Sequence, residues 1–378
     1  MKHFKQTIAV IVFTFVASII VFNGCKKKEE LEVNIAVNLP LTGDLSTYGE
    51  AVNNGVSLAM ENLKNKIKPG EPILNFDWQD NASQAKNAVN IMQKQFLKKV
   101  DIYISGVKPQ TMSIIDEIQK RQVPHFVWVF DAFVTKNYKN TLRTWVSYKY
   151  EPELYLRYIE LKRPKKIAII YVNFPHAEEE FNKLVIPKLS NLGVEKTLTE
   201  IYDWNKKDYK DIATKVKTFG PDLIIFNGFK ATIIGLVKSF KESNLIKEGN
   251  VICTYDMLDA AEELAPNVIE GIRVITPKFN TRHSDNTENW KQEFEKRFSR
   301  KPRYTDAYAY DMTNIIYDAA KRIGKNPNGT EMYNAILSTK LAGITGELIF
   351  DSDGDLKIDL EIGVYRNGKL IPDVERKE

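Results

Sequence analysis

The chain has 378 residues, of which 43% are hydrophobic and 27% charged, and it carries a formal net charge of +5. This length exceeds what one hydrophobic core usually organises, so we expect two domains of an ordinary globular protein. The charge is mild, and the basic residues are interleaved with acidic ones without a stripe of spaced aromatic residues. These features exclude nucleic acid as a partner.

The first residues have the pattern of a secretory leader. Lys2 and Lys5 precede an uninterrupted apolar run over residues 8–22, which ends in Asn-Gly-Cys at residues 23–25. Such a run is too short for a membrane-spanning helix, which needs about 20 residues, but it suits the core of a signal peptide. We therefore expect residues 1–24 to be a signal peptide. The alternative is an uncleaved membrane anchor, which would leave the same domain outside the membrane.

The small residue before Cys25 resembles the cleavage box of bacterial lipoproteins, in which the cysteine is acylated and becomes the new N-terminus. Phe22 departs from the aliphatic residue that is usual three positions before that cysteine. A lipid on Cys25 would hold the protein on a membrane, and residues 25–31 would form a short solvated tether. Cys253 is the only other cysteine, so no disulfide could then form within the chain. The apolar run around Cys253 predicts a buried thiol.

Residues 33–63 have the pattern of a short apolar strand, a loop and an amphipathic helix. Thr47, with Glu50 three residues later, fits a capping box, so the helix is predicted to begin at Thr47. Tyr48 would then lie at the helix N-terminus, where free backbone N–H groups and the helix dipole favour a polar or anionic ligand group. The alternative is an ordinary first unit of any α/β protein.

The rest of the chain alternates strands and helices in two series. In the first series we expect strands near 33–38, 73–78, 100–105 and 125–130, with helices near 47–64, 83–97 and 111–121. In the second we expect strands near 166–172, 195–202, 223–227, 251–254 and 271–275, with helices near 176–192, 209–219, 230–243 and 259–264. A long helix over 304–323 follows, and then a hairpin or paired strands around an Asp/Gly turn in 346–365. This alternation predicts an α/β fold of parallel sheets flanked by helices.

Several segments, taken in order, resemble the type I periplasmic binding proteins, and among them the leucine/isoleucine/valine-binding family of ABC-importer receptors. These segments are residues 33–63, 76–96, 100–113, 165–175, 221–229, 304–324 and 343–355. The resemblance implies two lobes, each a parallel sheet flanked by helices, joined by three crossings that act as a hinge. It implies an N-terminal lobe of residues 32–147 plus 278–350 and a C-terminal lobe of residues 148–277 plus 351–378.

Ligands of open parallel sheets lie outside the carboxyl ends of the strands, and the resemblance assigns residues to those loops. Asp256 aligns with the acidic residue that pairs with the ligand's ammonium group in amino-acid binders of the family. Tyr48 matches a first-lobe tyrosine. Phe174 and Phe229 match other aromatic positions of the site, but both lack a hydroxyl and would only pack. The alternatives are a capping or surface aspartate and aromatic residues of the core.

The predicted ligand loop of the first lobe departs from the family. Amino-acid binders present serine and threonine hydroxyls to the ligand carboxylate, whereas this chain has Lys108, Gln110 and Thr111, with Phe130 and Asp131 in the neighbouring loop. Gln110 and Thr111 could still donate hydrogen bonds, and Lys108 could meet an anion. The site is predicted to be bulkier and more aromatic, so an aromatic or cationic ligand fits it at least as well as a branched-chain amino acid.

The sequence predicts no metal site and no cofactor. Residues 351–355 superficially resemble a calcium loop, but the twelfth position of such a loop is Ile362 instead of glutamate. A turn is the better interpretation. The four histidines lack metal-ligand spacing, and the chain has no phosphate loop, dinucleotide fingerprint or nucleophile elbow.

Together these patterns predict a non-catalytic receptor that is lipid-anchored to a bacterial membrane, in the periplasm or at the cell surface. It would bind a small molecule between its lobes as a monomer and deliver it to an ABC permease in the membrane. One alternative is a ligand-sensing subunit that reports to a signalling partner. Others are an α/β enzyme without a short motif, and a divergent surface lipoprotein that has lost ligand binding.

Overall fold

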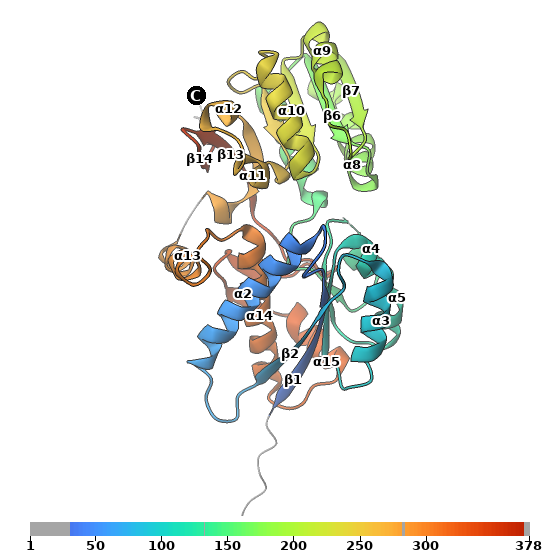
Figure 1. The fold of residues 1–378 in the computed structure, drawn as a ribbon, viewed down its shortest axis with the longest axis vertical. Helices are drawn as coiled ribbons and strands as arrows, with labels where there is room; N and C mark the ends of the chain where they lie inside the picture. The colour runs from blue at the N-terminus through green and yellow to red at the C-terminus, as the bar shows by residue number, and fades with distance from the viewer. Residues whose placement is uncertain (1–30, 132, 282–283, 374–378) are drawn as a thin grey trace, which may run out of the picture.

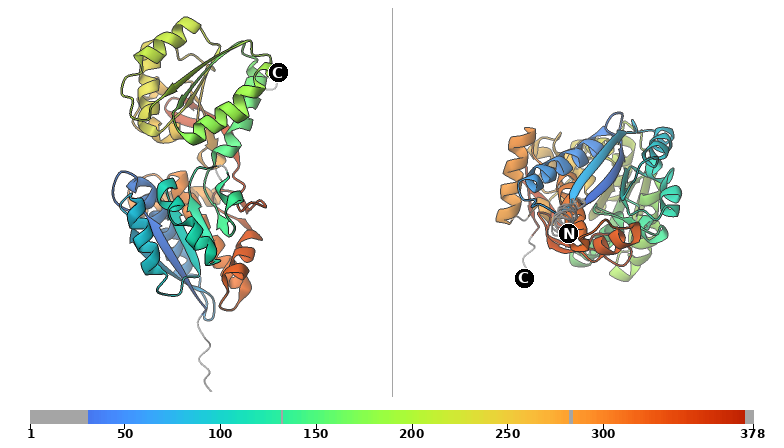
Figure 2. Two further views of the ribbon diagram at one scale, coloured as in Figure 1. Left: turned by 90° about the vertical axis from the view of Figure 1, so that its right-hand side faces the viewer. Right: turned by 90° about the horizontal axis from the view of Figure 1, so that it is seen from below.

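The computed structural model describes residues 31–131, 133–281 and 284–373 as two α/β lobes stacked one on the other (Figure 1). The first lobe fills the lower half of Figure 1 and the second lobe the upper half, and a narrower region connects them (Figure 2). Among the described residues, no helix combines the length and apolar character that a bilayer crossing requires.

Five parallel strands form the sheet of the first lobe, in the order β2-β1-β3-β4-β5. They span Ile73–Asp80, Glu32–Leu39, Ile102–Gly106, His125–Trp128 and Thr141–Leu142. The inner strands β3 and β4 are buried throughout because helices cover both faces of the sheet. On one side are α2 (Ser46–Lys64), α13 (Asp285–Phe298), α14 (Tyr304–Ile323) and α15 (Gly329–Leu337). On the other are α3 (Ala85–Gln95), α4 (Lys108–Met112) and α5 (Ile115–Lys120).

The sheet of the second lobe has the order β14-β13-β10-β9-β8-β6-β7. In that order the strands span Lys369–Pro372, Leu360–Arg366, Arg273–Pro277, Val251–Cys253, Leu223–Asn227, Lys166–Val172 and Lys196–Tyr202. β13 and β14 run antiparallel to their neighbours, and the other strands are parallel. Cys253 on β9 is fully buried, which confirms the buried thiol predicted from its apolar neighbours.

Helices flank this second sheet, and short elements complete both lobes. The helices are α7 (Glu151–Lys162), α8 (Pro175–Glu179), α9 (Lys210–Phe219), α10 (Lys230–Glu242), α11 (Asp256–Ala261) and α12 (Pro266–Ile269). The first lobe adds α6 (Val134–Asn137) and the paired strands β11 (Lys340–Ala342) and β12 (Glu347–Ile349). Single 3₁₀ or π turns occupy Tyr148–Tyr150, Glu180–Val185, Ile186–Lys188, Ser190–Leu192 and Lys278–Asn280.

Three elements have the predicted bounds, namely β6, β8 and α14. The helix predicted over 111–121 is instead divided into α4 and α5, and Ser113 at the break turns its hydroxyl to the carbonyl of Gln110 at 2.7 Å. The helix predicted over 176–192 is α8 followed by π and 3₁₀ turns. Pro187 lies in that stretch and cannot donate a helical hydrogen bond.

The start of α2 differs from the prediction in a way that matters for the loop before it. The helix begins at Ser46, and no side-chain capping bond forms, so the capping box of Thr47 and Glu50 is wrong. Asp80, at the end of β2, holds the loop instead. Its carboxylate accepts the backbone N–H groups of residues 41 and 42 at 2.9 and 3.1 Å. A contact that is distant in sequence therefore fixes the loop before α2.

The hairpin predicted over 346–365 is also wrong, although its turn is confirmed. β12 pairs with β11, while β13 pairs with β10 and β14, so the two strands belong to different lobes. Between them a single bridge joins Phe350 and Leu356. The turn is closed by Asp351, whose Oδ1 accepts the N–H groups of Asp353 and Asp355 at 2.9 Å.

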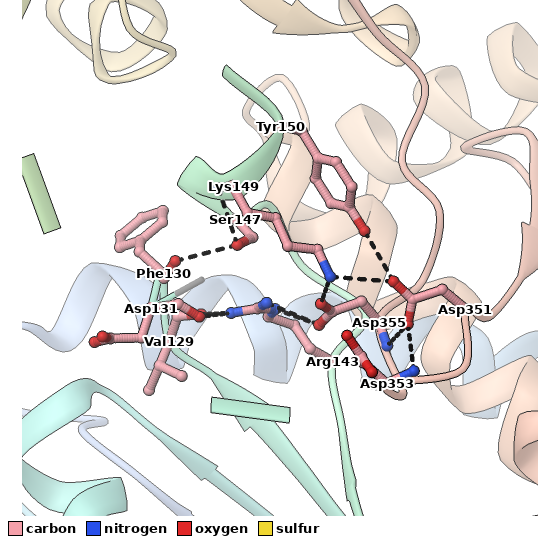
Figure 3. A network of polar contacts seen from close by, with 10 residues as sticks. All are labelled: Val129, Phe130, Asp131, Arg143, Ser147, Lys149, Tyr150, Asp351, Asp353 and Asp355. Carbon is pink, nitrogen blue, oxygen red and sulfur yellow. Dashed lines mark hydrogen bonds and ion pairs between the residues drawn. The ribbon is translucent and has the colours of Figure 1, made fainter. Parts of the chain in front are cut away.

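The chain passes between the lobes three times: after β5, after β10 and after β12 (Figure 1). Arg143 begins the first crossing, and its side chain is fully buried. Nε and Nη2 each lie 2.8 Å from Asp355 Oδ1, and Nη1 donates to the carbonyls of Val129 and Asp131 (Figure 3). This one guanidinium therefore joins the loop after β4, the first crossing and the third crossing.

Lys149, six residues further along the first crossing, strengthens the same connection. Its ammonium contacts Asp351 Oδ2 at 3.1 Å and also the carboxylate of Asp355. Tyr150 donates its hydroxyl to Asp351 at 3.3 Å (Figure 3). We call Arg143, Lys149, Asp351 and Asp355 the crossing network.

The contact between α2 and α14 yields the first prediction. A Cβ on Gly55 would lie 2.1 Å from the carbonyl oxygen of Asp306 and 2.8 Å from the Cβ of Ala309. Helix propensity alone favours alanine over glycine by about 1 kcal/mol. Because the clash is with backbone, we expect the opposite: Gly55→Ala should lower the free energy of unfolding by about 1–3 kcal/mol. Urea denaturation measures this, with Ser57→Ala on the same helix as the control. A more stable Gly55→Ala protein would refute the close contact.

Candidate functional site

The carboxyl ends of both sheets point toward the region where the lobes meet (Figure 2). The loops after β1, β3 and β4 reach it from the first lobe, and those after β6, β8 and β9 from the second. Phe130, after β4, stacks on Tyr255, after β9, with ring centroids 5.6 Å apart and planes 22° from parallel. This is the end of an open α/β sheet at which ligands bind, so it is the first place to search for a site.

An aromatic cluster of Tyr48, Phe130, Trp145, Tyr255 and Tyr304 occupies this junction. Tyr48, in the first turn of α2, meets Trp145 and Phe130 edge-on, with centroid distances of 5.6 and 6.5 Å. Phe130 packs on Trp145 at 4.2 Å, and Tyr255 meets Tyr304 at 6.4 Å. Tyr255 belongs to the second lobe and the other rings to the first lobe or the first crossing. The cluster thus joins the two lobes through apolar contact.

A second group of rings lies at the same end of the second lobe. Phe174 and Phe229, the N-cap residues of α8 and α10, meet edge-on at 5.3 Å, and His176 lies 5.2 and 6.0 Å from them. Burial lowers the pKa of His176 to about 4, while Asp131 raises it and Lys108 lowers it. The imidazole is therefore neutral at pH 7. Because Asp131 and Lys108 belong to the first lobe, His176 also lies near the junction.

Asp256 is the first residue of α11 and is half-buried. Among the residues that the structure describes, none forms a hydrogen bond or an ion pair with its carboxylate. Burial raises the pKa of Asp256 well above its ordinary value, and the negative charges of Asp259 and Glu151 add to this. Burial raises the pKa of the Tyr48 phenol, and the nearby carboxyl group of Asp256 raises it further. A partly buried carboxylate without an internal counter-ion is suited to a positively charged or hydrogen-bond-donating group of a ligand.

Lys108 and Asp131, both predicted site residues, pair with each other. Lys108 Nζ lies 2.6 Å from Asp131 Oδ2, and the two side chains are 38% and 29% exposed. Asp131 is also tied through its backbone carbonyl to Arg143. The positive charge of Lys108 is therefore balanced by Asp131 within the first lobe.

Gln110 and Thr111 are both buried on α4. Thr111 Oγ1 lies 2.9 Å from Ser105 Oγ, and Ser105 Oγ lies 2.7 Å from His125 Nε2. Burial lowers the pKa of His125 to about 3, so this histidine is neutral. Within the described residues, Gln110 Oε1 has no hydrogen-bond partner. Thr111 is thus engaged inside the lobe, whereas Gln110 keeps an unused acceptor.

Two buried glutamates lie behind Tyr255, and we call Glu151 and Glu180 the acid pair. Glu151 Oε1 accepts from Thr254 Oγ1 at 2.7 Å and from the N–H of Tyr255 at 3.4 Å, and Glu180 Oε2 accepts from Asn227 Nδ2 at 3.1 Å. The two carboxyl groups contact each other. Burial raises the pKa of Glu151 to about 7 and that of Glu180 well above its ordinary value. A proton held between the pair relieves the repulsion of two like charges.

The structure brings most of the predicted site residues into three groups. Tyr48, Phe130 and Asp256 lie together, Phe174 packs on Phe229, and Lys108 pairs with Asp131. Gln110 and Thr111 lie beneath this surface. In the described residues, no group of three or more His, Cys, Asp or Glu side chains could hold a metal ion. Rings, a free carboxylate and buried acceptors are features that hold a small molecule.

Sequence reasoning gave no role to several residues of the junction: Trp145, Tyr255, Tyr304, His176, Glu151 and Glu180. Tyr255 directly precedes Asp256, and Tyr304 opens the predicted long helix, so both could have been found from their neighbours. The acid pair gave no such signal. Glu180 ends a run of three glutamates that is typical of a solvated surface, yet it is fully buried.

Two α/β lobes joined by three crossings, with side chains of both lobes meeting at the sheet ends, define the class of two-lobed binding proteins. The family model described as periplasmic binding protein matches residues 32–368. The chain therefore belongs to the periplasmic binding protein family, and the resemblance inferred from its sequence is confirmed.

Comparisons with individual proteins agree with this assignment. Leu/Ile/Val-binding protein homolog 2 of Brucella abortus is 22% identical over 343 residues, which cover 86% of this chain and 87% of the relative. The structure of LivJ from Streptococcus pneumoniae in complex with isoleucine has a TM-score of 0.75 at 18% identity and covers 90% of this chain and 97% of its own. A solute binding protein from Rhodopseudomonas palustris in complex with 3,4-dihydroxybenzoic acid has a TM-score of 0.76 at 17% identity, covering 90% and 96%. These likenesses confirm the predicted two-lobed fold.

The acid pair leads to a prediction about pH. Its folded-state pKa values lie above the ordinary 4.5, so its contribution to stability is present at low pH and is lost as the pH rises through about 7. Glutamine cannot ionise. We therefore expect Glu180→Gln to gain about 1–3 kcal/mol of unfolding free energy relative to the parent between about pH 5 and pH 8.

Urea denaturation over this pH range tests the prediction. Glu160→Gln is the control, because Glu160 is exposed on the same helix as Glu151 and carries the same chemical change. A difference between Glu180→Gln and parent that stays constant with pH would contradict the titration of the pair.

Proposed function

We propose that this protein is an extracytoplasmic receptor that captures a small organic solute between its two lobes and delivers it to an ABC importer. The observation that carries the proposal is the junction of the lobes. Rings from both sides meet there, and Asp256 adds a carboxylate that no described residue neutralises. Membership of the periplasmic binding protein family supports both the role and the location outside the cytoplasm.

We assign the ligand contacts to both lobes. The first lobe would contribute Tyr48, Phe130 and the Lys108–Asp131 pair, with Gln110 and Thr111 behind them, and the second lobe Phe174, Phe229 and Asp256. A ligand that touches both lobes at once binds the closed arrangement more tightly than the open one. This difference in affinity sets how far the ligand shifts the protein toward the closed arrangement. The three crossings would act as the hinge, and we place the limits of the lobes at residues 147, 277 and 350.

The two solved relatives with bound solutes support the proposed size of the ligand. LivJ is seen with isoleucine and the Rhodopseudomonas palustris protein with 3,4-dihydroxybenzoic acid. Both are small molecules with an apolar body and a charged group. The junction described here belongs to a chain of the same family and offers an aromatic surface to an apolar body of this size.

We further propose that the protein is anchored by a lipid on Cys25, although the leader and Cys25 lie outside the described residues. The leader pattern supports this proposal. The first described strand, β1, begins at Glu32 on the side of the first lobe away from the second lobe (Figure 1). A tether of residues 25–31 would therefore approach from the side opposite the junction and leave the junction open to solutes.

A thermal-shift screen of amino acids, amides, aromatic acids and small cations tests the receptor role. A ligand at 100 times its dissociation constant adds about 2.7 kcal/mol of stability, so at least one compound should raise the melting temperature. Phe229→Ala should reduce the shift by removing ring contact. Phe219→Ala at the far end of α9 is the matched control and should keep the shift. A shift that survives Phe229→Ala unchanged would place the ligand elsewhere, and a screen in which no compound binds would count against the receptor.

The anchor is tested separately, by labelling growing cells with palmitate and partitioning the protein in a detergent phase. Cys25→Ser should abolish the label and move the protein to the aqueous phase. Each methylene group of an acyl chain in the membrane contributes about 0.8 kcal/mol of membrane affinity, and the variant would lose this contribution. Cys253→Ala should remain labelled, since that thiol is buried in the second lobe. Label retained by Cys25→Ser would show that the lipid is attached elsewhere.

A further inference from the structure

We propose that the solute is an organic cation that carries an apolar body and no carboxylate, such as an aryl-alkyl amine or a quaternary ammonium compound. This inference rests on the receptor function proposed above and names the class of its ligand. Three features of the junction support it: the unpaired carboxyl group of Asp256, the surface of the aromatic cluster and the pairing of Lys108 within the first lobe.

The second lobe places carboxyl groups at the junction without a matching cation, and burial keeps the pKa of Asp256 well above its ordinary value. Asp256 has no partner among the described residues, and the acid pair stands directly behind Tyr255. The nearest cations already have carboxylate partners. Arg303 lies 4.0 Å from Asp259 and 3.5 Å from Glu262, and Lys230 lies 2.8 Å from Glu263. A cationic group of a ligand beside Asp256 would favour the ionised form of this carboxyl group and would pair with it.

The aromatic cluster suits the same kind of group. Tyr48 and Phe130 are only half-buried, so their rings keep surface for a ligand next to Asp256. A cation within about 6 Å of an aromatic face is attracted by the ring quadrupole, and desolvation strengthens that attraction. A carboxylate at the same place would meet the negative faces of these rings. The cluster therefore favours an ammonium group and disfavours an anion.

Two groups of the first lobe that could meet a ligand carboxylate are already engaged. Pro109, in the first turn of α4, has no backbone N–H to donate. The helix α4 is also too short to act as an anion site by itself. Lys108 is held by Asp131 at 2.6 Å, and the hydroxyl of Thr111 is within hydrogen-bond distance of Ser105. The unused atom of Gln110 is an acceptor, Oε1, which fits a donor N–H of a ligand. The Gln110 oxygen can therefore accept from an ammonium group, while Lys108 is paired with Asp131 and is not free to meet a ligand carboxylate.

Three ligands that share one skeleton test the proposal by titration calorimetry. Phenethylamine carries only the ammonium group, L-phenylalanine carries ammonium and carboxylate, and 3-phenylpropionate carries only the carboxylate. We add phenyltrimethylammonium to separate amines from quaternary cations. At least one of the two cations should bind about tenfold or more tightly than L-phenylalanine, and 3-phenylpropionate should bind least.

A charge-removing variant locates the cation. Asp256→Asn keeps the shape of the side chain and should weaken binding of the cation by about tenfold or more. Glu242→Gln is the control, since Glu242 is exposed at the far end of α10 and undergoes the same carboxylate-to-amide change. It should leave the affinity unchanged. The comparison of ligands on the unmodified protein stands even if Asp256→Asn folds poorly.

The outcomes separate this inference from the receptor function. Binding of L-phenylalanine or 3-phenylpropionate without either cation overturns the cation proposal and leaves the receptor intact. Failure of all four compounds overturns the cation proposal, and the wider thermal-shift screen then decides about the receptor. Cation affinity that is equal in Asp256→Asn and parent also overturns it, because the carboxylate would then take no part.

Discussion

The buried guanidinium of Arg143 is the interaction on which the junction depends. Its positive charge is fully buried. The carboxylate of Asp355 and two backbone carbonyls of the loop after β4 bind it. Removing one partner of a buried ion pair leaves an unpaired charge, which costs about 3–5 kcal/mol. That loop carries Phe130 and Asp131, and the first crossing carries Trp145. The positions of these rings therefore follow from one electrostatic requirement.

The junction divides its polar and aromatic residues by depth. Hydroxyl and imidazole groups, such as those of Thr111, Ser105 and His125, are used inside the first lobe, where each buried polar atom needs a partner. Rings and the carboxylate of Asp256 stand toward the other lobe. The result is a largely aromatic surface, in which shape has a large part in the selection of a solute.

Much of the fold could be predicted from the sequence because apolar alternation is a local signal. β6, β8 and α14 were found with their bounds, and the series of segments identified the family. Contacts between distant residues could not be predicted in this way. Asp80 fixes the loop before α2, where no capping box forms at Thr47, and β13 pairs with β10 instead of forming the expected hairpin. The acid pair is the clearest case, since only the packed lobe reveals that Glu180 is buried.

Cys253 has a practical consequence for anyone who wishes to watch this molecule move. Its thiol has no exposed surface, and burial raises its pKa, so the reactive thiolate is scarce. A version of the chain that starts after Cys25 therefore presents no reactive sulfur. One cysteine introduced on each lobe would then accept a dye pair selectively, and energy transfer between the dyes would report the opening and closing of the lobes directly.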